Sequence, residues 1–495
     1  MKIVFTRLIQ FLAVAGVLFL LALWAIHGIV NFTTASKWQL QQQRIRDKEG
    51  ILTYSDMGDT EVADKNNFLK SRIITDDELS KNVTLIEYIL TRSQDLQPDV
   101  FQGRPRNFEK FVEILKTEKL LPDYLSTDDA LRSILQLTNP WMEEFRLAET
   151  RETVSFGNIQ ERVDSNERFA TLMKVPRMAS FIRLRVAIEA HLGNGNAAKR
   201  DIISLVHLIN LCKKNSQLTI LLVRWDVVLV LSDAIWEGIA AGCWTDSDLI
   251  EIQQQLGAID LSEDLAAYLL TERAFLIDTL EKYGNDGGYS RLVHDTSHLR
   301  QDGTIPDNMD ISEKLGILDA LWSRPRGLIF NELGKISEIT SSLIQTSQKN
   351  PFSEDIEKKI LQTTRNLSKF PNNFIYIITP MTLRSLLSVQ LAVMYSETRL
   401  REAWIACALE RYYIQNKEYP ESINISGVRE LEDLPLDPFA ENRPFNYERL
   451  SSNSYRLWSI GYNRKNENGS GRPPKNDISN GDIVWQSAQP SSGTK

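Results

Sequence analysis

The apolar run from Leu8 to Val30 constrains the fold of this chain more than any other stretch. It contains no charged residue. At about 1.5 Å per helical residue it is long enough to cross a hydrocarbon core of about 30 Å. Lys2 and Arg7 lie in a short basic start, residues 1–7. We therefore predict a transmembrane helix over residues 8–30 that contacts membrane lipid.

A removable signal peptide is the alternative interpretation of this run, because secretory signals also begin with basic residues and an apolar segment. The run is longer than the roughly 7–15 apolar residues of a signal peptide. Ala22 and Ala25 stand one position too far apart for a small-x-small cleavage site, and bulky Trp24 lies between them. An uncleaved, single-pass anchor is therefore favoured. Long domains are translocated largely regardless of nearby charges, so we expect the body on the exported side, periplasmic or extracellular.

Composition limits the classes of protein to which the chain can belong. Its 495 residues predict two or three domains. A net charge of −8, with 57 basic and 65 acidic residues, argues against a nucleic-acid partner. Cys212, Cys243 and Cys407 show no CxxC spacing and lie in apolar helical stretches, which predicts buried free thiols. One disulfide with a leftover cysteine is the alternative if the body is exported.

Helical patterns dominate the chain after the anchor. Residues 31–75 read as a continuation of the first helix followed by a polar linker, and residues 76–380 as an α-helical body. Because helical stretches alternate with short polar turns, we expect antiparallel helices in a repeat-like array. A capping box of Thr75 and Glu78 is expected to start the body, and Pro140 to separate helices at 127–137 and 140–150.

The stretch from Gln217 to Ala241 is apolar on nearly every side and has two interpretations. One is a second membrane span. Its charges, which include Arg224 and Asp226, argue against this, because each charge near a bilayer centre costs about 2.5–3.5 kcal/mol. A helix surrounded by other helices in a protein core is favoured.

The C-terminal residues 381–486 are predicted to form a long helix followed by a small sheet. The helix is expected to end near Asn416, before Pro420, which cannot donate a backbone N–H. Alternating apolar residues predict three short strands, and the end of the chain reads as a disordered tail. The strands are expected at 445–450, 455–460 and 482–485, and the tail at 487–495.

Four motifs in this region carry a family resemblance: AWIACALERYYIQNKEYPES, LPLDPFAENRPFNYERL, YRLWSIGYNRKNENG and NGDIVW. Their order and spacing over residues 400–485 resemble the soluble half of type II secretion major pseudopilins. The resemblance implies a long helix ending in a Tyr-Pro corner, then a Leu-Pro-x-Asp-Pro turn at Leu434–Pro438. It further implies a small antiparallel sheet whose last loop commonly holds calcium.

The chain departs from that family in its start and in its calcium loop. Pseudopilins carry a glycine followed by Phe-Thr-Leu-x-Glu directly before the helix, whereas this chain begins MKIVFTRLIQ, far upstream. We therefore expect neither prepilin-peptidase processing nor pilin-like polymerisation. The family's aspartate after the Gly-x turn is Asn463 here, which leaves Asp477 and Asp482 as the carboxylates for calcium. The alternative is a polar loop whose aspartates only cap turns.

No motif predicts a catalytic site. His294 and His298 have the i,i+4 spacing of zinc ligands, but no HExxH accompanies them, and incidental surface histidines are favoured. GxSxG, Walker A and GxGxxG motifs are missing from the sequence. We predict a non-enzymatic envelope scaffold or protein-interaction module beside a secretion or pilus-like apparatus, with an unidentified protein partner. An envelope enzyme with a site between the helical body and residues 284–310 is the alternative.

Overall fold

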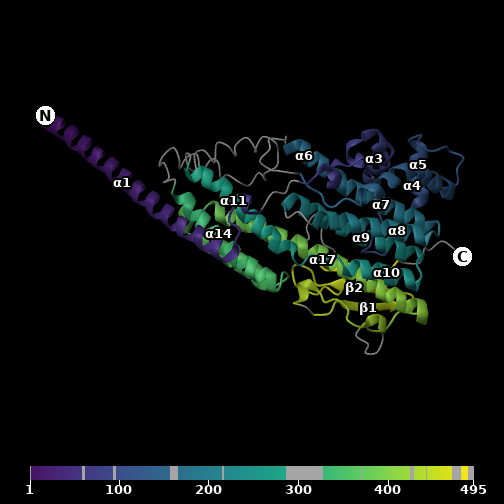
Figure 1. The fold of residues 1–495 in the computed structure, drawn as a ribbon. Coiled ribbons are helices and arrows are strands. Elements are labelled where there is room, and N and C mark those ends of the chain that lie inside the picture. Colours follow the sequence, from purple (N-terminus) through teal and green to yellow (C-terminus); the bar gives the residue numbers. More distant parts are fainter. Residues whose placement is uncertain are drawn as a thin grey trace. The chain divides into compact units, whose positions relative to one another are not determined.

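The computed structural model describes residues 2–57, 62–92, 96–156, 165–213, 217–285, 327–369, 371–423, 429–441, 443–470 and 481–488. These residues are mainly helical, with one small antiparallel sheet near the C-terminus (Figure 1). The chain divides into two compact units. Unit 1 is Met1–Asp59, Leu269–Lys349 and Asp355–Ser388, and unit 2 is Thr60–Tyr268, Asn350–Glu354 and Val389–Lys495.

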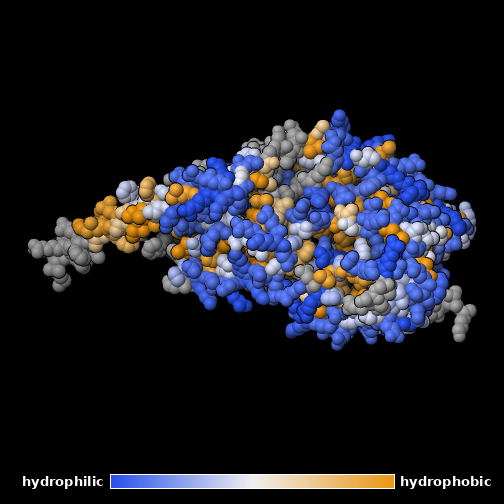
Figure 2. Space-filling view, turned by 60° about the horizontal axis from the view of Figure 1, so that its bottom comes forward, coloured by the Kyte–Doolittle hydropathy of each residue, from blue (hydrophilic) through white to orange (hydrophobic). Residues whose placement is uncertain are grey.

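A single unbroken helix, α1 (Lys2–Glu49), contains the predicted apolar segment and continues well beyond it. The apolar side chains described along its first part are exposed, with Trp24 77% and Phe32 75% accessible. Figure 2 shows them on the surface of the projecting part of α1. Among the described residues, this is the one helix long and apolar enough to cross a membrane.

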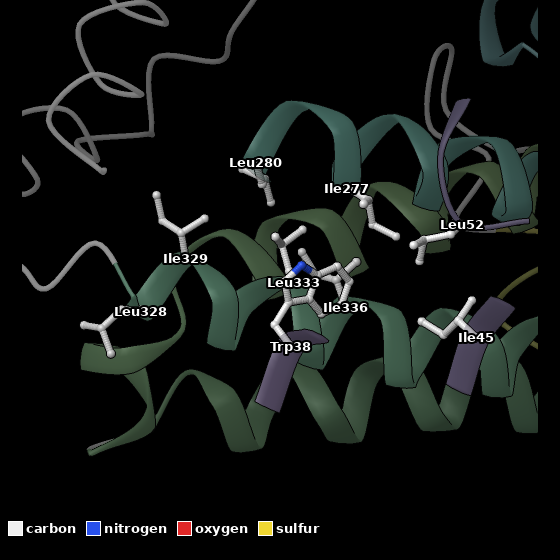
Figure 3. Packing of buried hydrophobic residues seen from close by; sticks show 9 residues of the cluster. All are labelled: Trp38, Ile45, Leu52, Ile277, Leu280, Leu328, Ile329, Leu333 and Ile336. Atoms are coloured by element: carbon white, nitrogen blue, oxygen red, sulfur yellow. The ribbon is translucent and has the colours of Figure 1, made fainter. Parts of the chain in front are cut away.

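The second part of α1 is built into the core of unit 1. Trp38, Ile45 and Leu52, spaced by heptads at the end of α1 and just beyond it, are buried. They pack with side chains of α11 (Asp264–Asn285) and α14 (Leu328–Lys349), as Figure 3 shows. The helix that projects with an apolar surface is therefore also a structural part of the body.

The remaining elements of unit 1 are η1 (Tyr54–Met57), α15 (Glu354–Leu367, from Asp355), α16 (Asn372–Ile375) and the start of α17 (Ile378–Asn416). A fully buried carboxylate, Glu332 of α14, caps the start of α17. It accepts hydrogen bonds from the backbone amides of Ile377, Ile378 and Thr379. The Thr379 hydroxyl donates a further bond at 2.5 Å. The orphan donors of this helix start are thus satisfied by another helix.

Unit 2 contains most of the remaining helices. In chain order they are η2 (Asp64–Asn66), η3 (Phe68–Lys70), α2 (Arg72–Thr75), α3 (Asp77–Arg92), α4 (Phe108–Thr117), α5 (Thr127–Ala148), α6 (Ser165–Leu172), α7 (Lys174–His191), α8 (Gly195–Lys213), α9 (Leu218–Ala241) and α10 (Asp246–Gly257). The helices α7, α8 and α9 pack on one another. Trp141 of α5 stacks on Phe145 at 5.5 Å and meets Phe181 of α7 edge-on at 5.2 Å.

The nearly all-apolar helix α9 lies in the core of unit 2. Its Arg224 is fully buried and forms an ion pair with Asp264 at the start of α11. The Trp225 indole also donates to Asp264, at 2.9 Å. A charge inside an apolar helix is thus compensated by a buried partner. The prediction of a core helix, rather than a second span, is confirmed.

Two predicted helix boundaries are wrong. Helix α5 runs through Pro140 without a break. Pro140 has no N–H to donate to the carbonyl of Gln136. Because both residues are exposed, water can bond to that carbonyl instead. The amide of Leu79 in α3 is capped by Asp76, at 3.2 Å, rather than by Thr75. The Thr75 hydroxyl instead bonds back within the preceding turn.

The C-terminal part of unit 2 follows the predicted order of a helix and three strands. Helix α17 ends at Asn416, and η6 (Arg429–Leu431) and η7 (Pro438–Ala440) precede the sheet. The strands β1 (Asn446–Ser451), β2 (Ser454–Ser459) and β3 (Ile483–Gln486) pair antiparallel in the order β1-β2-β3. The three predicted strands are confirmed. Residues 489–495 of the predicted tail lie outside the described residues.

A buried aspartate in the Leu-Pro-Leu-Asp-Pro stretch joins η7 to the sheet. Asp437 accepts bonds from the amide of Phe439 at 2.9 Å and from the hydroxyl of Ser459 at 2.7 Å. A third bond comes from the amide of Ile460 at 3.3 Å. Burial raises the pKa of Asp437. One side chain thus fixes the turn before β1 against the end of β2.

Candidate functional site

The predicted calcium ligands fall in the segment between β2 and β3. The structure places Asn463 and Asp482 in this segment, whereas Asp477 lies outside the described residues. Gly461, with φ at +61°, begins the loop, and a Cβ there would stand 2.3 Å from the carbonyl oxygen of Gly481. The two ends of the loop therefore approach closely only because Gly461 lacks a side chain.

Asp482, directly before β3, presents a buried carboxylate to this loop. It accepts hydrogen bonds from the amide of Gly469 at 2.8 Å and from the amide of Glu467 at 3.4 Å. Burial, together with the adjacent Glu467 side chain, raises the pKa of Asp482 to about 6. A carboxylate in this environment gains from the approach of a cation.

Glu467 is the acidic partner that the sequence prediction missed. Its Oε1 accepts a bond from the Nδ2 of Asn463 at 2.7 Å. Its Oε2 is buried and has no hydrogen-bond partner in the described part of the chain. No described lysine or arginine forms an ion pair with Glu467 or Asp482. A signal was present in the sequence, since Glu467 is the single carboxylate between Asn463 and Asp477.

This loop fits a hard cation in part. Calcium takes six to eight oxygens at about 2.3–2.6 Å, and two carboxylates with loop carbonyls and water are a suitable start. Asn463 turns its nitrogen toward Glu467, while its Oδ1 accepts from the amide of Lys465 at 2.9 Å. The described residues include no group of three or more His, Cys, Asp or Glu suited to a metal. Glu467 and Asp482 are therefore the pair that would hold the ion.

A second cluster of charged groups lies buried in unit 2, around Glu237 of α9. Arg106 forms a two-point ion pair with it, at 2.8 and 2.9 Å. Arg183 of α7 donates to Glu237 at 2.7 Å and pairs with Asp233 at 3.0 Å. Such bidentate, charge-assisted bonds fix relative orientation.

The same cluster extends to α17 and the sheet through Arg399. This residue pairs with Glu402 at 2.6 Å and with Asp233 at 3.2 Å, and its guanidinium lies 5.3 Å from the ring centre of Trp485. Arg106, Arg183 and Arg399 thus face three acids in this cluster, and burial raises the pKa of one of these acids, Glu402, to about 8. Ion pairs thus join α7, α9 and α17, and the cation–π contact of Arg399 with Trp485 adds β3.

A cavity of about 690 Å³ lies between α3, α5 and α7, and the charged cluster does not line it. Its walls include Trp141 and Met178 together with Glu87 and Arg177. Burial raises the pKa of Glu87. The described lining also includes the hydroxyls of Ser80 and Thr84, but no histidine or cysteine. The cavity is therefore lined by both apolar and polar side chains.

The other candidate residues take structural roles where they are described. His191 lies 3.3 Å from Asp128, and His207 lies 3.5 Å from Glu149. His294 and His298, and most of the 284–310 stretch, lie outside the described residues. The three cysteines are free thiols, as predicted, although Cys243 is only half-buried.

Comparison with known proteins adds no family to this geometry. No protein-family model, no curated protein and no solved structure matches the chain.

Proposed function

We propose that this protein is a membrane-anchored scaffold or protein-interaction module of the cell envelope, with its body on the exported side. The observation that carries the proposal is the continuity of α1. Side chains from Val14 to Ile29 are largely exposed and apolar, and the same helix then buries Trp38 and Ile45. An apolar surface of this length requires lipid. The buried part supports an uncleaved anchor.

The C-terminal part supports a place beside a secretion or pilus-like apparatus. Three features accord with the pseudopilin resemblance: the long helix α17, the turn held by Asp437, and the antiparallel order β1-β2-β3. Shared fold does not transfer function by itself. No glycine followed by Phe-Thr-Leu-x-Glu stands directly before α17, where a pseudopilin carries its processing signal. The role that we propose is therefore to bind a pilin-type subunit rather than to polymerise.

The surface proposed for that partner surrounds β1, the first strand of the sheet, whose one strand partner among the described residues is β2. Leu450 on β1 and Leu436 on the preceding turn are each 40% exposed. An edge strand with exposed apolar side chains is a common place for another chain to add. We also propose that the Glu467 and Asp482 pair binds calcium and steadies the loop behind this sheet.

Membrane attachment is tested by fractionation of cells that make the full chain or a chain without residues 2–30. The full chain should need detergent for release, and the shortened chain should not, because the first part of α1 is the one long, exposed apolar surface on a helix among the described residues. A reporter that is active only in the cytoplasm, fused to the C-terminus, tests on which side of the membrane the body lies. The anchor proposal is wrong if the intact chain stays in the aqueous fraction.

Partner binding is tested by placing a photo-crosslinking amino acid at Leu450 in the full chain. Tyr124, which is 86% exposed between α4 and α5, gives the matched control position. We expect crosslinks to a pilin-type subunit from Leu450 and none from Tyr124. Equal products at both positions, or none at Leu450 and Leu436, would remove support for the proposed partner.

A further inference from the structure

In unit 1, α1 and α14 run side by side in the same direction. The amide of Gly327, directly before α14, donates to the side chain of Asn31 at 2.7 Å. Further along both helices, Gln41 donates to the carbonyl of Gly334 at 2.7 Å. Contacts that advance together along both chains define a parallel pair. Figure 1 shows the two helices next to each other.

The two helices approach closely where glycine faces α1. A Cβ at Gly327 would stand 2.5 Å from the Oγ1 of Thr34 and 2.6 Å from the Cα of Asn31. At Gly334, a heptad further, it would stand 3.0 Å from the Oε1 of Gln41. The first residues of α14 therefore have a fixed height along α1, level with Asn31 and Thr34.

Helix α11 runs the opposite way along α1. Its Glu281 accepts from the indole of Trp38 at 2.5 Å, whereas Arg273, earlier in α11, pairs with Glu49 at the far end of α1. The end of α11 and the beginning of α14 thus lie at the same end of unit 1. This is the end from which the exposed apolar part of α1 projects.

The length of the apolar run sets the height of this end above a bilayer. From Leu8 to Val30 the helix rises about 34 Å, enough to fill a hydrocarbon core of about 30 Å even with the usual tilt of about 20°. The headgroup layer then adds about 5–7 Å on each side, which is roughly four helical residues. Those residues are Asn31 to Thr34, of which Asn31 and Thr34 contact Gly327.

We infer that Gly327 and the first residues of α14, up to Phe330, lie in the lipid headgroup layer, so that unit 1 rests directly on the bilayer. The partner of this surface is a phospholipid interface. Gly334 contacts Gln41, ten residues beyond Asn31 and therefore about 15 Å farther from the hydrocarbon. The contact with lipid is confined to the end of the unit. This inference rests on the proposed membrane-spanning role of α1.

The test places fluorescent labels on single cysteines of the full chain in phospholipid nanodiscs. Cys243 is first replaced by serine, since Cys212 and Cys407 are fully buried. Labels at Phe32, Phe330 and Glu338 are then compared in discs that carry a headgroup nitroxide. Phe330 is half-buried and Glu338 is exposed.

Quenching at Phe330 should fall within about twofold of that at Phe32, because both side chains would share one headgroup layer. At Glu338, about 16 Å beyond Gly327 along α14, quenching should be several times weaker. Quenching at Phe330 as weak as at Glu338, with strong quenching at Phe32, would overturn the inference. Asn331→Cys, at a half-buried neighbouring position, repeats the measurement if Phe330→Cys fails to fold.

A label at Ile26 separates this inference from the proposal on which it rests. Ile26 is 56% exposed within the apolar part of α1. It should be quenched by a nitroxide in the acyl chains. If neither Ile26 nor Phe32 responds to any lipid quencher, then α1 does not span the bilayer and the proposed function fails. If both respond and Phe330 does not, only the placement of α14 fails.

Discussion

Glu332 offers the sharpest test of what holds unit 1 together. Its carboxylate on α14 is fully buried and accepts hydrogen bonds from the backbone amides of Ile377, Ile378 and Thr379. Hydrogen bonds to a charged group contribute about 1.5–3 kcal/mol each, and orphaned buried donors cost about 1–3 kcal/mol. The full sum is not expected, because water can reach some of the freed donors.

We therefore expect Glu332→Ala to lower the free energy of unfolding by about 3–5 kcal/mol, because several buried or half-buried donors lose their acceptor at once. Glu332→Gln should lower it by about half as much. The glutamine oxygen still accepts hydrogen bonds from the backbone amides, whereas its NH2 group faces donors to which it cannot bond. Glu338→Gln is the matched control. Its side chain lies on the same helix, 64% exposed, and pairs only with Lys335, so its loss should stay below about 1 kcal/mol.

The assay is hydrogen exchange of the amides from Ile377 to Thr379, alongside denaturant unfolding of the full chain in detergent. Exchange gives the local effect, since a chain of two units need not unfold in one step. Glu332→Ala should accelerate exchange at these amides, and Glu338→Gln should not. The capping argument is refuted if Glu332→Ala leaves both the exchange rates and the unfolding midpoint at the values of Glu338→Gln.

Three further predictions concern the acidic loop, a buried glutamate and a glycine. Calcium binding is measured by calorimetry and should be lost in Asp482→Asn and in Glu467→Gln. It should be kept in the control Glu448→Gln, which changes an exposed acid on β1. Equal binding by all three variants would contradict the site. Burial raises the pKa of Glu410 from 4.5 to about 7. Between these two pH values the folded state keeps a proton on Glu410 that the unfolded chain releases. The free energy of unfolding should therefore fall by roughly 3 kcal/mol as the pH rises from about 4.5 to about 7, and this fall should disappear in Glu410→Gln. Gly327→Ala should destabilise by about 1–3 kcal/mol through its clash with Asn31. In contrast, Gly257→Ala, with nothing within 4 Å, should stabilise by up to about 1 kcal/mol in thermal unfolding.

The sequence predicted those elements whose causes are local. The apolar run determines the first part of α1, and the chemistry of Pro420 agrees with a helix that ends at Asn416. Alternating side chains located the three strands. Local cues failed where two solutions differ little in energy. An exposed Pro140 can stay within a helix, and Asp76 can cap α3 as well as Thr75 can.

The sites were less predictable because their partners lie far apart in the chain. Asn463 and Asp482 both lie in the segment between β2 and β3, but the orientation of Glu467 toward them depends on the folded loop. Arg106 and Glu237 are separated by 131 residues, and Glu332 and Thr379 by 47. Periodicity within a single helix carries no information about such pairs.

The placement of Trp38 and Ile45 in the core of unit 1 has a practical consequence for anyone who wants a detergent-free version of this protein. Trimming the chain back to the end of the first helix would delete an indole and a branched side chain from the interior. The remainder would then open a hydrophobic hole and aggregate. A start at Val30, whose partly buried side chain also packs against this core, would remove most of the exposed apolar segment and keep the interior intact.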